Sequence, residues 1–199
     1  MAALIVLGMA GAMAGIIFTA PKRAVVFSVE TPPVEAAVAF DSFGPGHAFG
    51  TNFWGVGDLA HGDWFVPARS GPLSALELAI ESSPQEPGSA EVFLARDSQG
   101  FPGATMESYV VAPRGSGPAS NSVPAVIVSV AQPVLESGVK YWLCVRGGGW
   151  VWHFNNQDLA QKAARETGRN QWASAGDYCY CGAFRVLVRT NQLFPRADY

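Results

Sequence analysis

The sequence predicts an all-β domain, built as an antiparallel, two-sheet, jelly-roll-like sandwich and preceded by an N-terminal apolar helix. Three observations support this fold class. Short runs of alternating apolar and polar residues recur along the chain, as in half-buried strands. Turn-forming residues separate these runs, with 22 Gly and 14 Pro among 199 residues. Helix-like and strand-like segments do not alternate, which disfavours a parallel sheet with crossover helices.

The chain begins with an apolar run, Ala2–Ala20, in which Thr19 is the only polar side chain. A run of this length could cross a bilayer or form the apolar part of a secretory signal. Lys22 and Arg23 follow the run rather than precede it, an order that opposes export under the positive-inside rule. A helix without a polar face would nevertheless be unusual in a cytosolic protein. We therefore expect export, with residues 1–20 as a signal peptide or membrane anchor helix.

The rest of the chain divides into three parts. Residues 21–39 are expected to be a linker, because Thr31-Pro32-Pro33 interrupts a stretch without steady alternation. Residues 40–190 are expected to form the β-sandwich domain, a length typical of a single β unit. Residues 191–199 are expected to be a C-terminal tail.

Several runs before residue 131 alternate as strands do. They are Leu73–Ile80, Ala90–Arg96, Ser108–Ala112 and Ala125–Val130. In the first run, Leu76, Leu78 and Ile80 share one face. In the second, Val92 and Leu94 oppose Phe93 and Ala95. Between the second and third runs, Asp97–Gly103 is expected to be a turn in which Pro102 prevents the strand from continuing.

Two aromatic runs flank the glycine turn Gly147–Gly149 and predict an antiparallel hairpin. Pairing Val145 with Trp150 sets its register. One face then carries Tyr141, Leu143, Val145, Trp150, Trp152 and Phe154, and is dense enough to be core. The opposite face carries Trp142, Cys144, Val151, His153 and Asn155.

One helix and one further strand complete the predicted elements. Asp158 can cap a helix over Leu159–Thr167, and Gly168 can terminate it. The last strand, Ala183–Arg189, alternates regularly. Its apolar side chains are expected to face inward: Phe184, Val186 and Val188.

The order of several short motifs extends this interpretation. They are Phe40-Asp41-Ser42-Phe43, Phe65-Val66-Pro67, Val92–Gly103, Leu135–Leu143, Trp152-His153-Phe154-Asn155, Trp172 and Ala183-Phe184-Arg185-Val186. Together they resemble the choice-of-anchor R domain of bacterial exported proteins. The resemblance implies an export signal, one β-rich domain and a surface anchor, and it implies no activity. After Val188 no apolar tail or sorting motif follows, so the N-terminal segment is the only anchor expected.

Charge excludes one class of partner. The net charge is −3 and no block of Lys or Arg occurs, so nucleic-acid binding has no electrostatic basis. Membrane contact is expected only through the N-terminal segment.

Candidate chemical groups are few. A metal could bind the loop residues Asp58, His61 and Asp63, although a polar loop with Asx turns explains the same pattern. No Ser lies in a nucleophile elbow and no Gly-rich segment forms a phosphate loop, so we expect neither an enzyme nor a cofactor.

The three cysteines allow two interpretations. A disulfide could join Cys144 to Cys179 or Cys181, as expected in an oxidising compartment. Alternatively, all three are small buried apolar side chains.

Aromatic residues provide the better functional lead, since the chain has six Trp and five Tyr. The inner faces of the predicted strands cannot accommodate all of five rings: Trp54, Trp64, Trp142, Trp172 and Tyr178. Such rings could stack on sugars or could cover the ends of the sandwich. The predicted register places Trp142 as a stacking ring beside His153 and Asn155 as hydrogen-bonding groups.

These patterns predict an exported module, periplasmic, secreted or on the cell surface, that binds or supports an unknown partner such as a glycan or a cell-surface component. A carbohydrate-binding module is the first alternative, and an exposed aromatic platform would favour it. A secreted hydrolase is the second, and a cleft with converging carboxylates would favour it.

Overall fold

The computed structural model describes residues 23–25, 35–83, 88–113, 124–157, 159–168 and 170–190. These residues form strands and one short 3-10 turn, η1 (Pro45–His47), so the predicted all-β class is confirmed. The strands are β1 (Arg23–Val25), β2 (Ala36–Asp41), β3 (Phe53–Val56), β4 (His61–Phe65), β5 (Gly71–Leu78), β6 (Ile80–Ser82), β7 (Ala90–Ser98), β8 (Phe101–Val111), β9 (Ala125–Val128), β10 (Val134–Leu135), β11 (Tyr141–Arg146), β12 (Trp150–His153), β13 (Ala160–Gly168), β14 (Gln171–Tyr180) and β15 (Phe184–Arg189).

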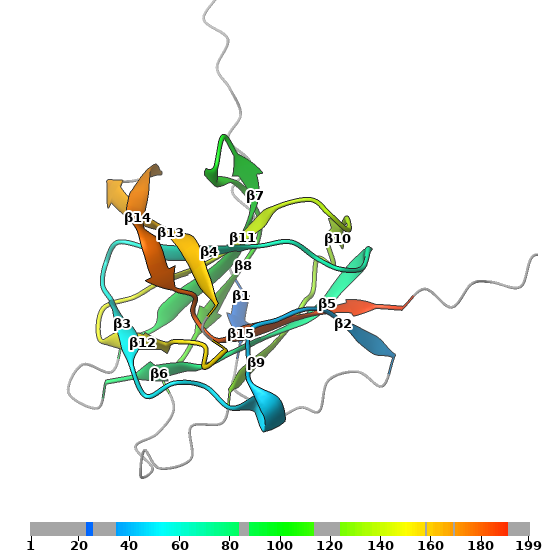
Figure 1. The fold of residues 1–199 in the computed structure, drawn as a ribbon, viewed down its shortest axis with the longest axis horizontal. Helices are drawn as coiled ribbons and strands as arrows, with labels where there is room; N and C mark the ends of the chain where they lie inside the picture. The colour runs from blue at the N-terminus through cyan, green and yellow to red at the C-terminus, as the bar shows by residue number, and fades with distance from the viewer. Residues whose placement is uncertain are drawn as a thin grey trace, which may run out of the picture.

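Hydrogen bonding joins the strands into three sheets (Figure 1). The largest has seven strands in the order β1-β8-β7-β11-β4-β13-β14. The second has the order β10-β5-β15-β2, and β9 also pairs with β5. The smallest has the order β3-β12-β6. Apart from the parallel pair β1–β8, the pairings between described strands are antiparallel.

Side chains from all three sheets form one hydrophobic core in a sandwich-like arrangement. Leu94 and Leu143 enter it from the largest sheet, Leu76 and Val186 from the second, and Trp152 from the smallest. All five are 0% exposed. Burial of an apolar side chain of this size stabilises the folded state by about 1.5–3 kcal/mol, so this shared core holds the sheets together.

The predicted aromatic hairpin is wrong. β11 lies between β4 and β7, whereas β12 lies between β3 and β6, so Val145 and Trp150 are not paired. Gly147–Gly149 instead carries the chain from the largest sheet to the smallest. A Cβ on Gly147 would lie 2.8 Å from the Cα of Ala90, so the crossing requires glycine.

The predicted core face is largely correct despite the wrong partners. Alternation specifies which face a side chain occupies, but it does not specify the neighbouring strand. Five of the six residues expected in the core belong to it: Tyr141, Leu143, Val145, Trp150 and Trp152. The sixth, Phe154, is half-buried outside that cluster.

The predicted helix over Leu159–Thr167 is also wrong, because β13 occupies Ala160–Gly168. β13 pairs with both β4 and β14, and its ladder with β14 contains register shifts. Ala163 and Ala164 are buried beside β4. Pairing on both edges therefore overrides the helix propensity of this alanine-containing segment.

Other strand predictions hold. In β7, Val92 and Leu94 face the main core while Phe93 and Ala95 face the opposite side. In β15, the side chains of Phe184, Val186 and Val188 are buried, as expected.

Pro102 does not end a strand, contrary to the prediction, since β8 extends from Phe101 to Val111. Among the described strands, β7 is the one that pairs with β8 at this end, because β1 reaches no further along β8 than Tyr109. Proline is tolerated at such an edge position because its missing N–H faces away from the ladder.

Strands also lie within the expected linker, where β1 pairs with β8 and β2 pairs with β15. Ala39 of β2 is buried, so this segment contributes to the core. The expected apolar helix of residues 1–20 and the tail of residues 191–199 lie outside the described residues. Within the part of the chain that the structure describes, there is no helix with the length and apolar character needed to cross a membrane.

Candidate functional site

Trp142, expected as an exposed stacking ring, is a buried structural residue. Its side chain is 1% exposed, and its Nε1 donates a hydrogen bond to Asp97 Oδ1 at 2.8 Å. β4 and β7 flank β11 on both edges, and the ring lies in a second apolar cluster on the outer face of the largest sheet. A ring enclosed in this way does not provide a platform for a ligand.

His153 lies in a different sheet from Trp142, so the two side chains do not share a face. Its Nε2 is 3.4 Å from Glu81 Oε2, and its ring contacts Phe49 and Phe53. The predicted cluster of Trp142 with His153 is therefore wrong, because the predicted hairpin does not form.

The Asn155 side chain bonds backbone groups of the chain and does not face solvent. Its Nδ2 donates to Leu159 O at 3.0 Å and to Cys181 O at 2.8 Å. Its Oδ1 accepts from the backbone N–H groups of Gln157 and Leu159 at 2.9 and 3.0 Å. These four bonds use the full capacity of the amide, so none remains for a ligand.

The predicted metal ligands are not brought together. Asp58 is exposed in a loop, whereas His61 and Asp63 are buried on β4. The His61 ring stacks on Trp54, and Asp63 Oδ2 accepts a hydrogen bond from the Gly182 N–H at 2.8 Å. Across the described ranges, no group of three or more His, Cys, Asp or Glu side chains is placed to hold a metal ion.

Asp63 is an unusual buried carboxyl. Burial raises its pKa to about 7, and the hydrogen bond from Gly182 offsets only part of that effect. Its Oδ1 has no hydrogen-bond partner among the described residues. Burial, together with the charge of Arg165, lowers the pKa of the neighbouring His61. The stability of the fold should therefore depend on pH through these two residues.

The predicted disulfide does not form at Cys144, which is a buried free thiol, as is Cys181. Burial raises the pKa of both thiols, and the Asp63 carboxyl raises each further. The side chain of Cys179 lies outside the described residues. Cys144 and Cys181 therefore act as small apolar side chains in the packing.

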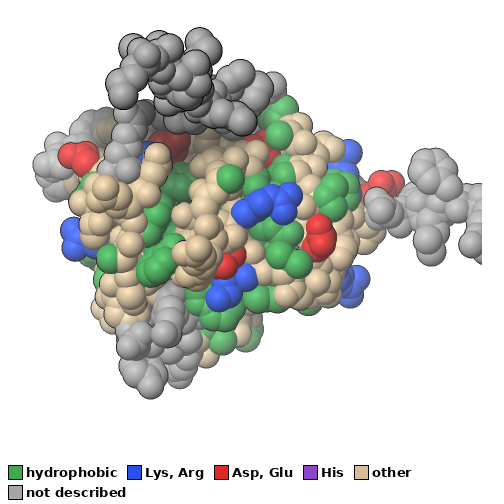
Figure 2. Space-filling view, turned by 90° about the horizontal axis from the view of Figure 1, so that it is seen from above, with side chains coloured by type: hydrophobic (Ala, Val, Ile, Leu, Met, Phe, Trp, Pro, Cys, Tyr) green, Lys and Arg blue, Asp and Glu red, His purple; other side chains and the backbone are tan. Residues whose placement is uncertain are grey.

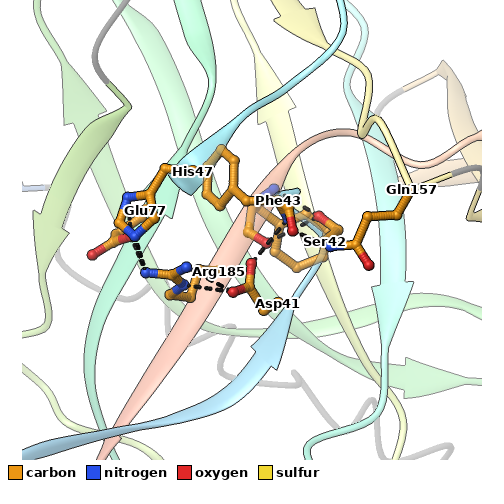
Figure 3. A network of polar contacts seen from close by, with 8 residues as sticks. Asp41, Ser42, Phe43, His47, Glu77, Gln157 and Arg185 are labelled. Carbon is orange, nitrogen blue, oxygen red and sulfur yellow. Dashed lines mark hydrogen bonds and ion pairs between the residues drawn. The ribbon is translucent and has the colours of Figure 1, made fainter. Parts of the chain in front are cut away.

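A polar network joins the beginning of the domain to its end (Figure 3). Asp41 Oδ2 accepts hydrogen bonds from Arg185 Nε at 2.9 Å and Nη2 at 2.7 Å. Arg185 Nη1 also donates to the buried Glu77 carboxylate at 3.3 Å and contacts His47. The two carboxylates and the guanidinium satisfy one another, which indicates a structural clasp between β2, β5 and β15.

Ser42, a buried residue directly after β2, bonds the backbone at the start of β15 and so belongs to the same clasp. Its Oγ accepts the Phe184 N–H at 2.8 Å and lies 2.9 Å from the carbonyl oxygens of Gly182 and Phe184. Ser42 is 0% exposed. The motifs around Asp41 and Arg185, which carried the sequence resemblance, are thus bonded to each other across more than a hundred residues of chain.

We expect Ser42→Ala to lower the free energy of unfolding by about 1–3 kcal/mol, because the Phe184 N–H would be left buried without an acceptor. Urea unfolding followed by circular dichroism measures this loss. The control is Ser70→Ala, because Ser70 Oγ accepts one backbone hydrogen bond at an exposed site. Equal effects of the two substitutions would contradict a structural role for the clasp.

An aromatic layer covers the outer face of the largest sheet. Its buried members include Phe93 and Trp142, and the half-buried Trp64, Phe101 and Trp172 pack against them. The rings of Phe93 and Trp172 have centroids 6.4 Å apart. The β13–β14 and β7–β8 hairpins end at the same side of the molecule, at the top of Figure 1. The layer therefore continues to the space between the two hairpin ends.

A groove of about 370 Å³ lies between these hairpin ends. It is lined by Ser98, Phe101, Pro102, Gly103, Asn170 and Trp172. Figure 2 looks onto this end of the molecule and shows hydrophobic side chains among tan polar and backbone atoms, with charges of both signs scattered around them. Exposed polar groups and half-buried rings thus meet in one open groove.

Each wall of the groove is fixed by a carboxylate. Asp97 Oδ2 accepts the Gly100 N–H at 3.1 Å, while its Oδ1 holds Trp142. On the other wall, Glu166 Oε1 accepts the Asn170 N–H at 2.9 Å, and Arg146 binds both Glu166 oxygens at 2.9 Å. The hairpin ends are therefore held in place before a ligand binds.

The sequence only partly anticipated this groove. Trp172 was among the aromatic residues in excess of the inner faces, and Phe101, Pro102 and Gly103 lay in a predicted turn. The signal missed was an aromatic residue directly after the Gln99–Gly100 turn. Nothing in sequence spacing indicates that this turn lies beside Asn170, about seventy residues later.

No protein-family model matches this chain, and no curated protein matches it significantly.

Proposed function

We propose that this chain is an exported binding module that takes a glycan in the groove between the β7–β8 and β13–β14 hairpins. The observation that carries the proposal is the pairing of two half-buried aromatic rings, Phe101 and Trp172, with exposed Ser98 and Asn170 in one groove. A sugar presents an apolar ring face and polar hydroxyl edges. Aromatic rings complement the face, and hydroxyl and amide groups complement the edges.

The size of the groove supports a small ligand segment. Its volume of about 370 Å³ is near the lower end of the range for small-molecule sites, roughly 300–1,000 Å³. The half-buried state of Trp172 leaves part of its ring available for stacking. One or two sugar units of a longer chain would fill such a groove, with the remainder extending into solvent.

Because the two hairpin ends that form the groove are already held in place, a few contacts can give measurable affinity. Ordering flexible side chains and loops on binding costs about 0.5–1.5 kcal/mol per side chain. Asp97 and Glu166 hold the two hairpin ends, so less of this cost remains at binding. The proposed site is therefore preorganised.

The strands are inferred to wind as a jelly-roll-like sandwich, and residues 1–20 to form an export signal or anchor helix. The motif order resembling the choice-of-anchor R domain supports a periplasmic, secreted or cell-surface location. The module is proposed to bind rather than to catalyse.

Trp172→Ala is expected to weaken glycan binding about tenfold or more, because it removes the stacking ring. A polysaccharide array identifies the bound glycan, and isothermal titration compares the variant with the native chain. The control is Trp64→Ala, since Trp64 is also half-buried on the outer aromatic layer but does not line the groove. If no polysaccharide binds, or if both variants bind equally well, the proposed function is wrong.

A further inference from the structure

We infer that the ligand is a neutral glycan and that the Asn170 side chain sets its specificity by bonding two adjacent hydroxyls, without a bridging cation. This inference rests on the proposed function, because it names the ligand class of the same groove.

The charge around the groove favours a neutral ligand. None of the described residues that line the groove carries a charged side chain. Asp97, which precedes the lining residue Ser98, would repel an anionic sugar, and both its oxygens are already bonded to Gly100 and Trp142. Uronic acids and sulfated sugars would therefore gain little attraction here.

Arg146, the cation that binds Glu166 behind the Asn170 wall, is also committed. Arg146 bonds Glu166 and Glu91, with N–O distances of 2.9 and 3.1 Å, and its guanidinium lies 5.4 Å from the centre of the Phe93 ring. Two carboxylates offset its single charge, so it offers no free charge to an acidic ligand. Arg169, beside Asn170, lies outside the described residues and is therefore included in the test.

Asn170 is placed to present its amide at the rim of the groove. Its φ is 59°, a left-handed conformation that asparagine tolerates better than most residues. The hydrogen bond from its backbone N–H to Glu166 Oε1 fixes this turn. Glu166 therefore sets the position of the backbone from which the side chain extends.

The amide offers the right chemistry for a pair of hydroxyls. It supplies both a donor and an acceptor, so one hydroxyl can accept from Nδ2 while its neighbour donates to Oδ1. A cation-bridged sugar site would instead need several carboxylate or carbonyl oxygens around the ion. Among the described side chains that line this groove there is no carboxylate.

Two substitutions separate the effect of the Asn170 side-chain amide on binding from the effect of the backbone turn. Asn170→Gly removes the side chain and tolerates positive φ, and Asn170→Asp keeps the size but replaces a donor with a negative charge. Both are expected to weaken binding of a neutral oligosaccharide about tenfold. Arg169→Gln is expected to leave that affinity unchanged. Thermal unfolding of each variant checks that the fold is retained.

The probes are neutral polysaccharides (a glucan, a mannan and a galactan) and acidic ones (polygalacturonate, alginate and heparin), each tested with and without EDTA. Trp172-dependent binding of a neutral polysaccharide, weakened in both Asn170 variants and unaffected by EDTA, supports the inference. Binding confined to acidic polysaccharides, loss of binding in EDTA or unchanged affinity of the Asn170 variants overturns it, while Trp172 dependence preserves the proposed function. Absence of binding to all six overturns both.

Discussion

Trp152→Ala is expected to lower the free energy of unfolding by about 3–5 kcal/mol, the range for removing a large buried aromatic side chain. Trp152 is 0% exposed and belongs to the core shared by all three sheets. Its ring packs against Phe184 at a centroid distance of 5.8 Å, and its Nε1 donates to Ala183 O at 3.3 Å. Truncation would leave a cavity where the smallest sheet meets β15.

Urea unfolding followed by circular dichroism measures this effect, and Trp152→Phe provides a milder variant should the alanine variant fail to fold. The control is Phe53→Ala, because Phe53 is an aromatic residue of the same small sheet that is 51% exposed. A loss below about 1 kcal/mol for Trp152→Ala would contradict its place in the core.

The same site offers a coupling test. A Cβ on Gly182 would lie 2.3 Å from Trp152 Cε2, closer than packed atoms approach. Gly182→Ala is therefore expected to be costly with Trp152 present and much less costly with Trp152→Ala. A double-mutant cycle measures this non-additivity.

Asp63→Asn is expected to stabilise the protein at pH 8 by about 3–5 kcal/mol, and to have little effect on stability near pH 4. The folded-state pKa of Asp63 is raised to about 7 from an ordinary value of 3.8. Above pH 4 the unfolded chain releases this proton while the folded protein retains it, so stability falls as the pH rises towards 7 and then levels off. Asparagine removes this penalty and can still accept the Gly182 N–H.

The difference in free energy of unfolding between the native chain and the Asp63→Asn variant separates the effect of Asp63 from that of His61. The pKa of His61 is lowered in the folded state, so its contribution to stability is lost as the pH falls through its unfolded value of 6.5. Both proteins share this contribution, so it cancels when their free energies of unfolding are subtracted at each pH. A difference that stays constant from pH 4 to pH 8 would show that Asp63 is not held protonated by burial.

The fold could be predicted as far as local alternation determines it. In β7 and β15, alternating residues identified the buried faces correctly, because a strand places successive side chains on opposite faces. The same signal did not identify the partners of β11 and β12, because a glycine turn can connect two sheets as well as two strands of a hairpin. For β13, pairing on both edges overrode the helix preference of the segment.

The candidate site depends on contacts between distant residues, which explains why it was predicted least well. Trp142 and Trp172 are both aromatic residues on strands of the largest sheet, yet the first is enclosed by β4 and β7 and the second reaches a groove. Trp172 reaches the groove because β14 contacts β8, a contact between segments far apart in the sequence. Sequence alone indicated an excess of rings, and the structure indicates which of them face a ligand-sized space.

The most direct test of the central claim is the NMR signal of the Trp172 indole N–H during titration with the oligosaccharide selected on the array. We expect this signal to shift in a saturable way, whereas the signals of Trp152 in the core and Trp64 away from the groove remain in place. A shift confined to Trp54 or Trp64, or an unchanged Trp172 signal at saturating oligosaccharide, would contradict glycan binding in the groove.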